Sequence, residues 1–134
     1  MEERIKEIAS RVLEWFSKGS TSPYECRISP TNNCNLACLP CVARGRPAYE
    51  AGKELSKEEY IGIIREACRI GVKRFDICGG GEPFCRKDVV DIMEEIKKHD
   101  VFGTISTNGT LISKEASKRI VEMEWDEVRF SVNG

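Results

Sequence analysis

Three cysteines lie close together in one short stretch of the chain. Cys34, Cys38 and Cys41 form a C-x-x-x-C-x-x-C pattern. Thiolates at this spacing can bind one metal centre together, and two centres fit: zinc, with a fourth ligand such as Cys78 or Cys85, or a four-iron four-sulfur cluster. Three thiolates leave one position of either centre without a cysteine ligand from the triplet, so that a small molecule could bind there.

A glycine-rich stretch follows a predicted strand further along the chain. Gly79 to Pro83 reads G-G-G-E-P. Glycines allow another molecule to approach the backbone closely, and the Glu82 carboxylate could hold an ammonium group. Taken alone, the stretch also fits an ordinary glycine-rich turn with a surface glutamate.

Hydrophobic periodicity indicates the elements that must position both motifs. The expected strands are residues 24–29, 72–78, 102–106 and 127–132, and the expected helices are residues 56–70, 87–99 and 113–123. This alternation predicts an α/β domain with parallel strands and right-handed crossovers, spanning residues 24–134. The carboxyl ends of parallel strands meet at one edge, so both motifs should lie there. An amphipathic helix is expected within residues 1–19, and residues 42–53 should form a loop beside the metal site.

Four stretches together resemble a known family, the radical S-adenosylmethionine enzymes. They are R-I-S-P-T-N-N-C-N-L-A-C-L-P-C at Arg27 to Cys41, G-G-G-E-P at Gly79 to Pro83, T-N-G-T at Thr107 to Thr110, and the F-S-V-N-G strand that carries Ser131. The resemblance covers Tyr24 to Gly134. It implies a partial TIM-like (β/α) barrel of about four parallel strands, where the family's usual barrel has six strand and helix units.

The resemblance also implies a cofactor and a reaction. Cys34, Cys38 and Cys41 would ligate three irons of a 4Fe-4S cluster, and S-adenosylmethionine would chelate the fourth. Reductive cleavage of S-adenosylmethionine would give a 5′-deoxyadenosyl radical, which abstracts hydrogen from a substrate that the sequence does not identify. Ferredoxin or flavodoxin would be a suitable electron donor.

Contacts to S-adenosylmethionine follow from the same resemblance. Gly80, Gly81 and Glu82 would hold its amino group. The Pro40 carbonyl would meet the adenine amino group, at a position where family members commonly carry an aromatic residue. Ribose or carboxylate contacts would come from Ser106, Ser131 and Asn133. The residues alone leave a different class open: a metal-binding module, with zinc or an iron-sulfur centre, that serves interaction or redox sensing without catalysis.

Composition sets further bounds. The chain has 134 residues, a formal net charge of −1 and seven cysteines, an odd number that cannot pair completely in intrachain disulfides. Clustered cysteines in a chain without a signal-peptide pattern favour metal binding in the cytoplasm. Near-zero net charge and no membrane-length apolar run favour neither nucleic acid nor membrane as a partner. Cys26, Cys68 and Cys78 are expected to be small buried hydrophobes.

The last residues predict an unfinished sheet. Phe130 to Gly134 read as a strand tip without the loop and helix that should follow it. The expectation is therefore a fragment, or a half-barrel that associates with another chain through its open edge.

Overall fold

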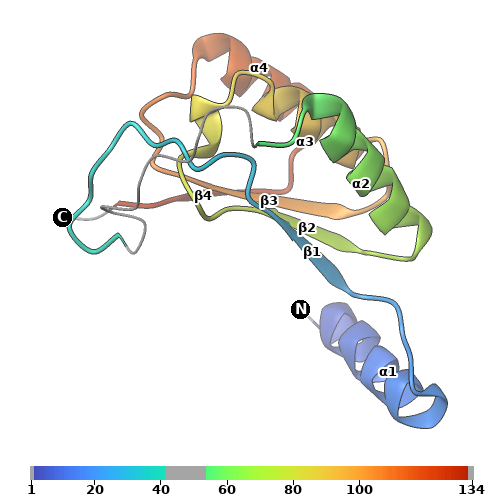
Figure 1. The fold of residues 1–134 in the computed structure, drawn as a ribbon. Helices are drawn as coiled ribbons and strands as arrows, with labels where there is room; N and C mark the ends of the chain where they lie inside the picture. Colours follow the sequence, from blue (N-terminus) through green and yellow to red (C-terminus); the bar gives the residue numbers. More distant parts are fainter. Residues whose placement is uncertain (1, 42–53, 133–134) are drawn as a thin grey trace.

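The structure, a computed structural model, describes residues 2–41 and 54–132 and contains one parallel sheet. Its four strands follow the chain order β1-β2-β3-β4 (Figure 1). Their bounds are β1 (Glu25–Ile28), β2 (Arg74–Ile77), β3 (Phe102–Thr107) and β4 (Glu127–Phe130). This confirms the predicted α/β fold with four parallel strands and is consistent with a partial TIM-like barrel. Residues 42–53, which were expected to form a loop beside the site, lie outside the described residues, as does Asn133.

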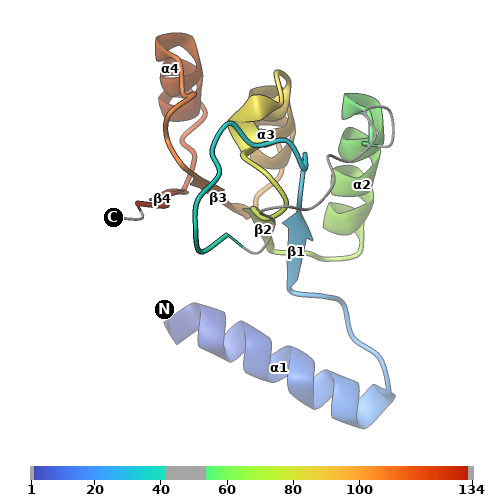
Figure 2. The ribbon, with the colours of Figure 1, turned by 60° about the vertical axis from the view of Figure 1, so that its left-hand side comes forward.

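Three helices cover one face of the sheet, and a fourth lies on the other side of the molecule (Figures 1 and 2). The covering helices are α2 (Lys57–Arg69), α3 (Val89–Lys97) and α4 (Lys114–Glu122). Ser56 and Glu59 form the predicted capping box at the start of α2, and the Ser113 side chain accepts from the Ala116 amide at the start of α4. A short 3-10 helix, η1 (Pro83–Cys85), follows the glycine stretch.

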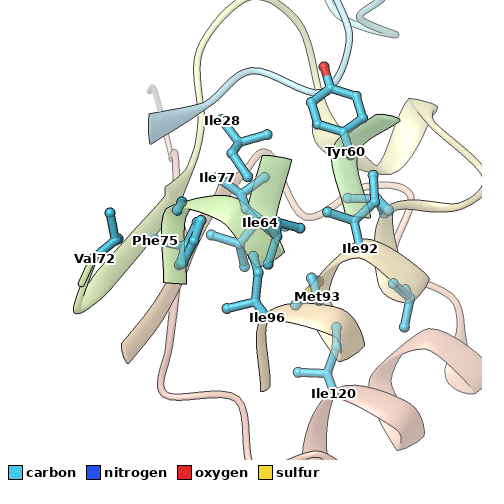
Figure 3. Packing of buried hydrophobic residues seen from close by; sticks show 14 residues of the cluster. Ile28, Tyr60, Ile64, Val72, Phe75, Ile77, Ile92, Met93, Ile96 and Ile120 are labelled. Carbon is cyan, nitrogen blue, oxygen red and sulfur yellow. The ribbon is translucent and has the colours of Figure 1, made fainter. Parts of the chain in front are cut away.

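The hydrophobic core lies between the sheet and the three covering helices (Figure 3). Phe75 and Ile77 point from β2 toward Ile64 of α2 and Ile96 of α3, and all four side chains are fully buried. Burying an aliphatic or aromatic side chain of this size stabilises a fold by about 1.5–3 kcal/mol. The core therefore fixes how the sheet and helices pack, and it leaves the opposite face of the strands for other side chains.

The N-terminal helix α1 (Glu2–Lys18) has no buried residue. Its apolar side is exposed, with Phe16 at 74% and Leu13 at 68%. Arg11 connects it to the domain, because its guanidinium donates hydrogen bonds to the carbonyls of Ser22, Pro23 and Gly71. Within residues 2–41 and 54–132, none of the helices has the length and apolar character needed to cross a membrane.

Several elements are shorter than predicted. Helix α3 covers residues 89–97 where residues 87–99 were expected, and β2 covers residues 74–77 where residues 72–78 were expected. The difference in β2 has a local cause. The Val72 amide donates to the Ala67 carbonyl at 3.0 Å, so this residue still belongs to the turn that ends α2. The apolar pattern in the sequence therefore begins at Val72, before Arg74, where the pairing of β2 begins.

Candidate functional site

The loop that carries the cysteines is joined to the glycine stretch by backbone hydrogen bonds. The Gly81 amide donates to the Thr31 carbonyl at 2.9 Å, and the Glu82 amide donates to the Asn33 carbonyl at 2.8 Å. A side chain at Gly81 would overlap the Asn33 backbone. Gly80 has a φ of +54°, and a Cβ there would lie 2.6 Å from the Ser29 hydroxyl oxygen. Both glycines are thus required where the two loops meet.

Glu82 fastens the glycine stretch to the loop after β3. This residue is only 3% exposed. Its carboxylate accepts hydrogen bonds from the Thr107 hydroxyl at 2.6 Å, the Asn108 amide at 2.7 Å and the Phe84 amide at 3.1 Å. Sequence reasoning marked the T-N-G-T stretch as a landmark but gave Thr107 and Asn108 no role. Their positions at the next strand end were the available clue.

The cysteine loop also contacts the loop after β3 directly. The Asn35 side chain donates to the Thr110 hydroxyl at 2.8 Å and accepts from the Asn108 side-chain amide at 3.0 Å. The loops after β1, β2 and β3 therefore form one hydrogen-bonded unit at the carboxyl edge of the sheet. This is the edge at which the sequence predicted the site.

These loops enclose a pocket of about 370 Å³. It is lined by Cys34, Leu36, Cys38, Pro40, Cys41, Gly79, Gly81, Glu82, Ser106, Thr107, Asn108 and Ser131. The cysteine triplet, Pro40, Gly81, Glu82, Ser106 and Ser131 were all candidate site residues from the sequence, and the structure brings them together. Gly80, another candidate, packs instead against Ser29 and Thr31.

The three cysteines of the pocket carry free thiols. Cys34 and Cys41 are exposed and Cys38 is half-buried, and the Cys41 amide donates to the Cys38 carbonyl at 3.1 Å to form a turn. Across residues 2–41 and 54–132, no three His, Cys, Asp or Glu side chains are gathered closely enough to hold a metal ion. Binding one metal would therefore require the three thiols to move closer together, and outside that turn the loop has no regular secondary structure. Three thiols in one pocket fit a thiophilic centre, either zinc or iron-sulfur.

Cys78 and Cys85, the two cysteines considered as a fourth ligand, lie in surroundings that favour the protonated thiol. Burial raises the pKa of the Cys85 thiol and also that of the Cys78 thiol. The Cys78 thiol also donates a hydrogen bond to the Asp76 carboxylate at 3.3 Å, which raises its pKa further. A metal binds the thiolate, so both environments oppose ligation. Cys26 and Cys68, expected to be buried, are half-buried and pack against the core.

Charged side chains occupy the face of the sheet opposite the helices. Asp76 is 4% exposed and pairs with Arg27 at 3.1 Å and Arg129 at 3.7 Å, while the Thr104 hydroxyl donates to it at 2.8 Å. Burial alone would raise the pKa of Asp76, but the hydrogen bonds from Thr104 and Cys78 and the two arginines outweigh it and lower the pKa.

Sequence reasoning missed this ion-pair network. The alternation of charged and apolar residues in E-C-R-I, R-F-D-I and E-V-R-F was a signal for a charged face of the sheet, although it does not identify the pairs.

Comparisons with known proteins show what the chain is similar to in sequence and in fold. The family described as the Radical SAM superfamily matches residues 28–134. GTP 3′,8-cyclase of Limosilactobacillus fermentum is 37% identical over 110 residues, which make up 80% of this chain and 32% of that protein. Mycofactocin maturase MftC of Mycolicibacterium smegmatis is 32% identical over 124 residues, which make up 92% of this chain and 31% of that protein. The chain thus spans about a third of the length of these curated relatives.

A solved structure extends the likeness to the fold. SuiB of Streptococcus suis, in its complex with S-adenosylmethionine, superposes with a TM-score of 0.70 at 24% sequence identity. The superposition covers 98% of this chain and 29% of SuiB. Nearly the whole chain, α1 included, therefore has a counterpart in that fold.

Proposed function

Because the chain belongs to the radical SAM superfamily, we propose that its pocket binds a 4Fe-4S cluster with S-adenosylmethionine and forms a 5′-deoxyadenosyl radical. Enzymes of this superfamily use both groups. Reductive cleavage of the sulfonium to methionine and the radical is the chemistry that the two groups supply when bound. The observation that carries the proposal is the pocket itself, where three free thiols share one space with Glu82, Ser106 and Ser131.

The chain's own residues divide the work of holding these groups. Cys34, Cys38 and Cys41 would each ligate one iron, which leaves the fourth iron for the amino and carboxylate groups of S-adenosylmethionine. Glu82 faces the pocket with a carboxylate that three protein donors already orient. A carboxylate oxygen accepts more than one hydrogen bond, so Glu82 could also accept one from the cofactor amino group.

The remaining candidates surround the same space. Gly81 exposes its backbone to the pocket, and Gly80 supports that position by packing on the cysteine loop. Ser106 and Ser131 come from neighbouring strand ends and would contact the ribose or the carboxylate, together with Asn133. The Pro40 carbonyl would meet the adenine amino group. These groups would orient the cofactor and exclude water from it.

The proposal covers radical formation and hydrogen-atom abstraction, with ferredoxin or flavodoxin as the electron donor. A GTP cyclase and a mycofactocin maturase are both among the matched relatives, so the substrate is left open. The competing function is a metal-binding module for interaction or redox sensing. Pro40, which lines the pocket at a position where family members commonly carry an aromatic residue, is the observation that favours it.

Anaerobic reconstitution of the full chain with iron and sulfide tests cluster binding. We expect about four irons per chain and broad absorbance in the blue part of the visible spectrum. Both should be lost when Cys34, Cys38 and Cys41 are changed to Ala, and both should be kept in the Cys68→Ala control, whose thiol packs against the core. Colourless protein with stoichiometric zinc would contradict the proposal.

Chemical reduction of the reconstituted chain with S-adenosylmethionine separates the two functions. Formation of 5′-deoxyadenosine, measured by liquid chromatography and mass spectrometry, is expected of the enzyme. A chain that holds the cluster but forms none would instead support the non-catalytic module.

A further inference from the structure

Cys78 lies where the ion-pair network meets the pocket. It follows β2 directly and precedes Gly79, which lines the pocket. Its thiol reaches Asp76, on the face of the sheet away from the helices. Ile77 pairs with Ile105 in the parallel register, so Cys78 lies beside Ser106, another pocket-lining residue. Cys78 does not itself line the pocket, but it is next to a lining residue along the chain and beside another on β3.

The surroundings of Cys78 keep its thiol protonated. The sulfur donates to an Asp76 carboxylate oxygen at 3.3 Å, and Asp76 is itself held by Thr104 at 2.8 Å and by Arg27 at 3.1 Å. Burial, and then Asp76, raise the pKa of this thiol, so it keeps its proton. A neutral thiol is a poor nucleophile and a poor metal ligand. The reactivity that remains is homolytic: the S–H bond is weaker than an alkyl C–H bond.

We propose that Cys78 donates a hydrogen atom to carbon radicals formed in the adjacent pocket. This rests on the proposed function, which supplies the radical. In the donation a C–H bond forms and the Cys78 S–H bond breaks, which leaves a thiyl radical on the sulfur. The thiyl then takes one electron from the external one-electron donor that reduces the cluster, and one proton from solvent, which restores the thiol.

The other cysteines do not share this position. Cys26 and Cys68 pack against the core on the helix side of the sheet, and Cys85 lies in η1, outside the strands that carry the ion-pair network. Cys34, Cys38 and Cys41 are committed to the metal in the proposed function. Cys78 is the cysteine whose sulfur is hydrogen-bonded to the network on the pocket side of the sheet.

Solvent deuterium can report this transfer without any substrate. The thiol proton exchanges with D₂O, whereas C–H hydrogens do not. The full chain, reconstituted with iron and sulfide, is reduced with dithionite in D₂O with S-adenosylmethionine alone, and the 5′-deoxyadenosine is analysed by mass spectrometry.

We expect one solvent-derived deuterium in the 5′-deoxyadenosine formed by the unchanged chain, and a fall of that deuterium to natural abundance with C78S. The serine hydroxyl preserves the hydrogen bond to Asp76, but its O–H bond is too strong to give up a hydrogen atom. C68S, which removes a half-buried thiol on the helix side, should keep the deuterium.

Each other outcome overturns the inference in a recognisable way. Product without deuterium in the unchanged chain, or with equal deuterium in C78S, removes Cys78 as the donor while the proposed function stands. No 5′-deoxyadenosine from any cluster-loaded chain removes the proposed function, and the inference with it.

A second readout needs no cofactor. In the metal-free chain, alkylation by iodoacetamide is mapped to individual cysteines by mass spectrometry across pH. The rate at Cys78 should rise with a midpoint above the ordinary thiol value of about 8.5. A midpoint below about 7 would mean a thiol that is mostly ionised at neutral pH and has no S–H bond to donate.

Discussion

The two faces of the sheet use neighbouring residues of the same strands for different purposes. In β2, Phe75 and Ile77 point into the core and are fully buried, whereas Arg74 and Asp76 lie on the opposite face among ion pairs. Because side chains alternate along a strand, the core side fixes the position of the backbone that carries the polar side. Side chains that form the core and side chains that form the ion pairs thus alternate along one strand. Substitutions at adjacent residues should therefore have different effects on the protein.

The largest effect on stability should come from the core face. Phe75→Ala removes a fully buried ring between the sheet and the covering helices. We expect the free energy of unfolding to fall by about 3–5 kcal/mol, because apolar burial is lost and a cavity remains. Urea unfolding followed by circular dichroism measures this change. A loss below about 1 kcal/mol would mean that the core does not depend on this ring, and the separation of the two faces would not hold.

An intermediate effect is expected where the two motif loops meet. In Gly81→Ala the added methyl group overlaps the Asn33 backbone, so the cysteine loop must move away from the glycine stretch. We expect unfolding stability to fall by about 1–3 kcal/mol and reconstituted iron content to fall with it, because the triplet is no longer held over the pocket. Iron analysis and urea unfolding of the same preparation measure the two effects.

Gly62→Ala is the matched control for that prediction. Gly62 lies within α2, and no atom is within 4 Å of the position its Cβ would take. The same chemical change there should stabilise the chain by about 0.5–1 kcal/mol and leave iron content unchanged. If both variants lose iron equally, the contact between the loops is not what positions the triplet.

The sequence was informative wherever the cause of a feature is local. Hydrophobic periodicity and turn residues predicted the order of strands and helices, and the capping pair of Ser56 and Glu59 predicted the start of α2. Both motifs were placed at one edge because parallel strands end together. Element ends were less certain, since Val72 continues the apolar pattern of β2 while it bonds to the end of α2.

Contacts between strands were beyond prediction from the sequence. Asp76 meets Arg27 and Arg129 only because three strand registers bring them together, and no spacing along the chain encodes a register. Glu82 was predicted to face a ligand, but its bonds to Thr107 and Asn108 depend on the same alignment. The core face could be predicted from the pattern of each strand alone, whereas the contacts of the polar face depend on how all four strands are aligned.

The polar face should make a contribution to the free energy of unfolding that depends on pH. The hydrogen bonds and arginines around Asp76 hold its pKa in the folded chain below the unfolded value of about 4. The folded chain therefore binds fewer protons, so the stabilisation is complete above about pH 4 and is lost as the pH falls through the lowered pKa. Asp76→Asn removes this dependence. At neutral pH we expect the free energy of unfolding to fall by about 1–3 kcal/mol, because the bonds to Arg27 and Thr104 lose their charged acceptor.

The decisive measurement is the difference in unfolding free energy between the unchanged chain and Asp76→Asn, followed by urea unfolding from neutral to acid pH. That difference should shrink as the carboxylate of the unchanged chain is protonated. Asp100→Asn, the same chemical change at an exposed position, is the matched control and should change the unfolding free energy little. Glu95 is 3% exposed, and its pKa is lowered first by the hydrogen bond from Arg65, so acid sensitivity from Glu95 remains in every variant. A difference that stays constant with pH would show that Asp76 acts through its shape and not through its charge, and the two faces would then be alike in what holds them together.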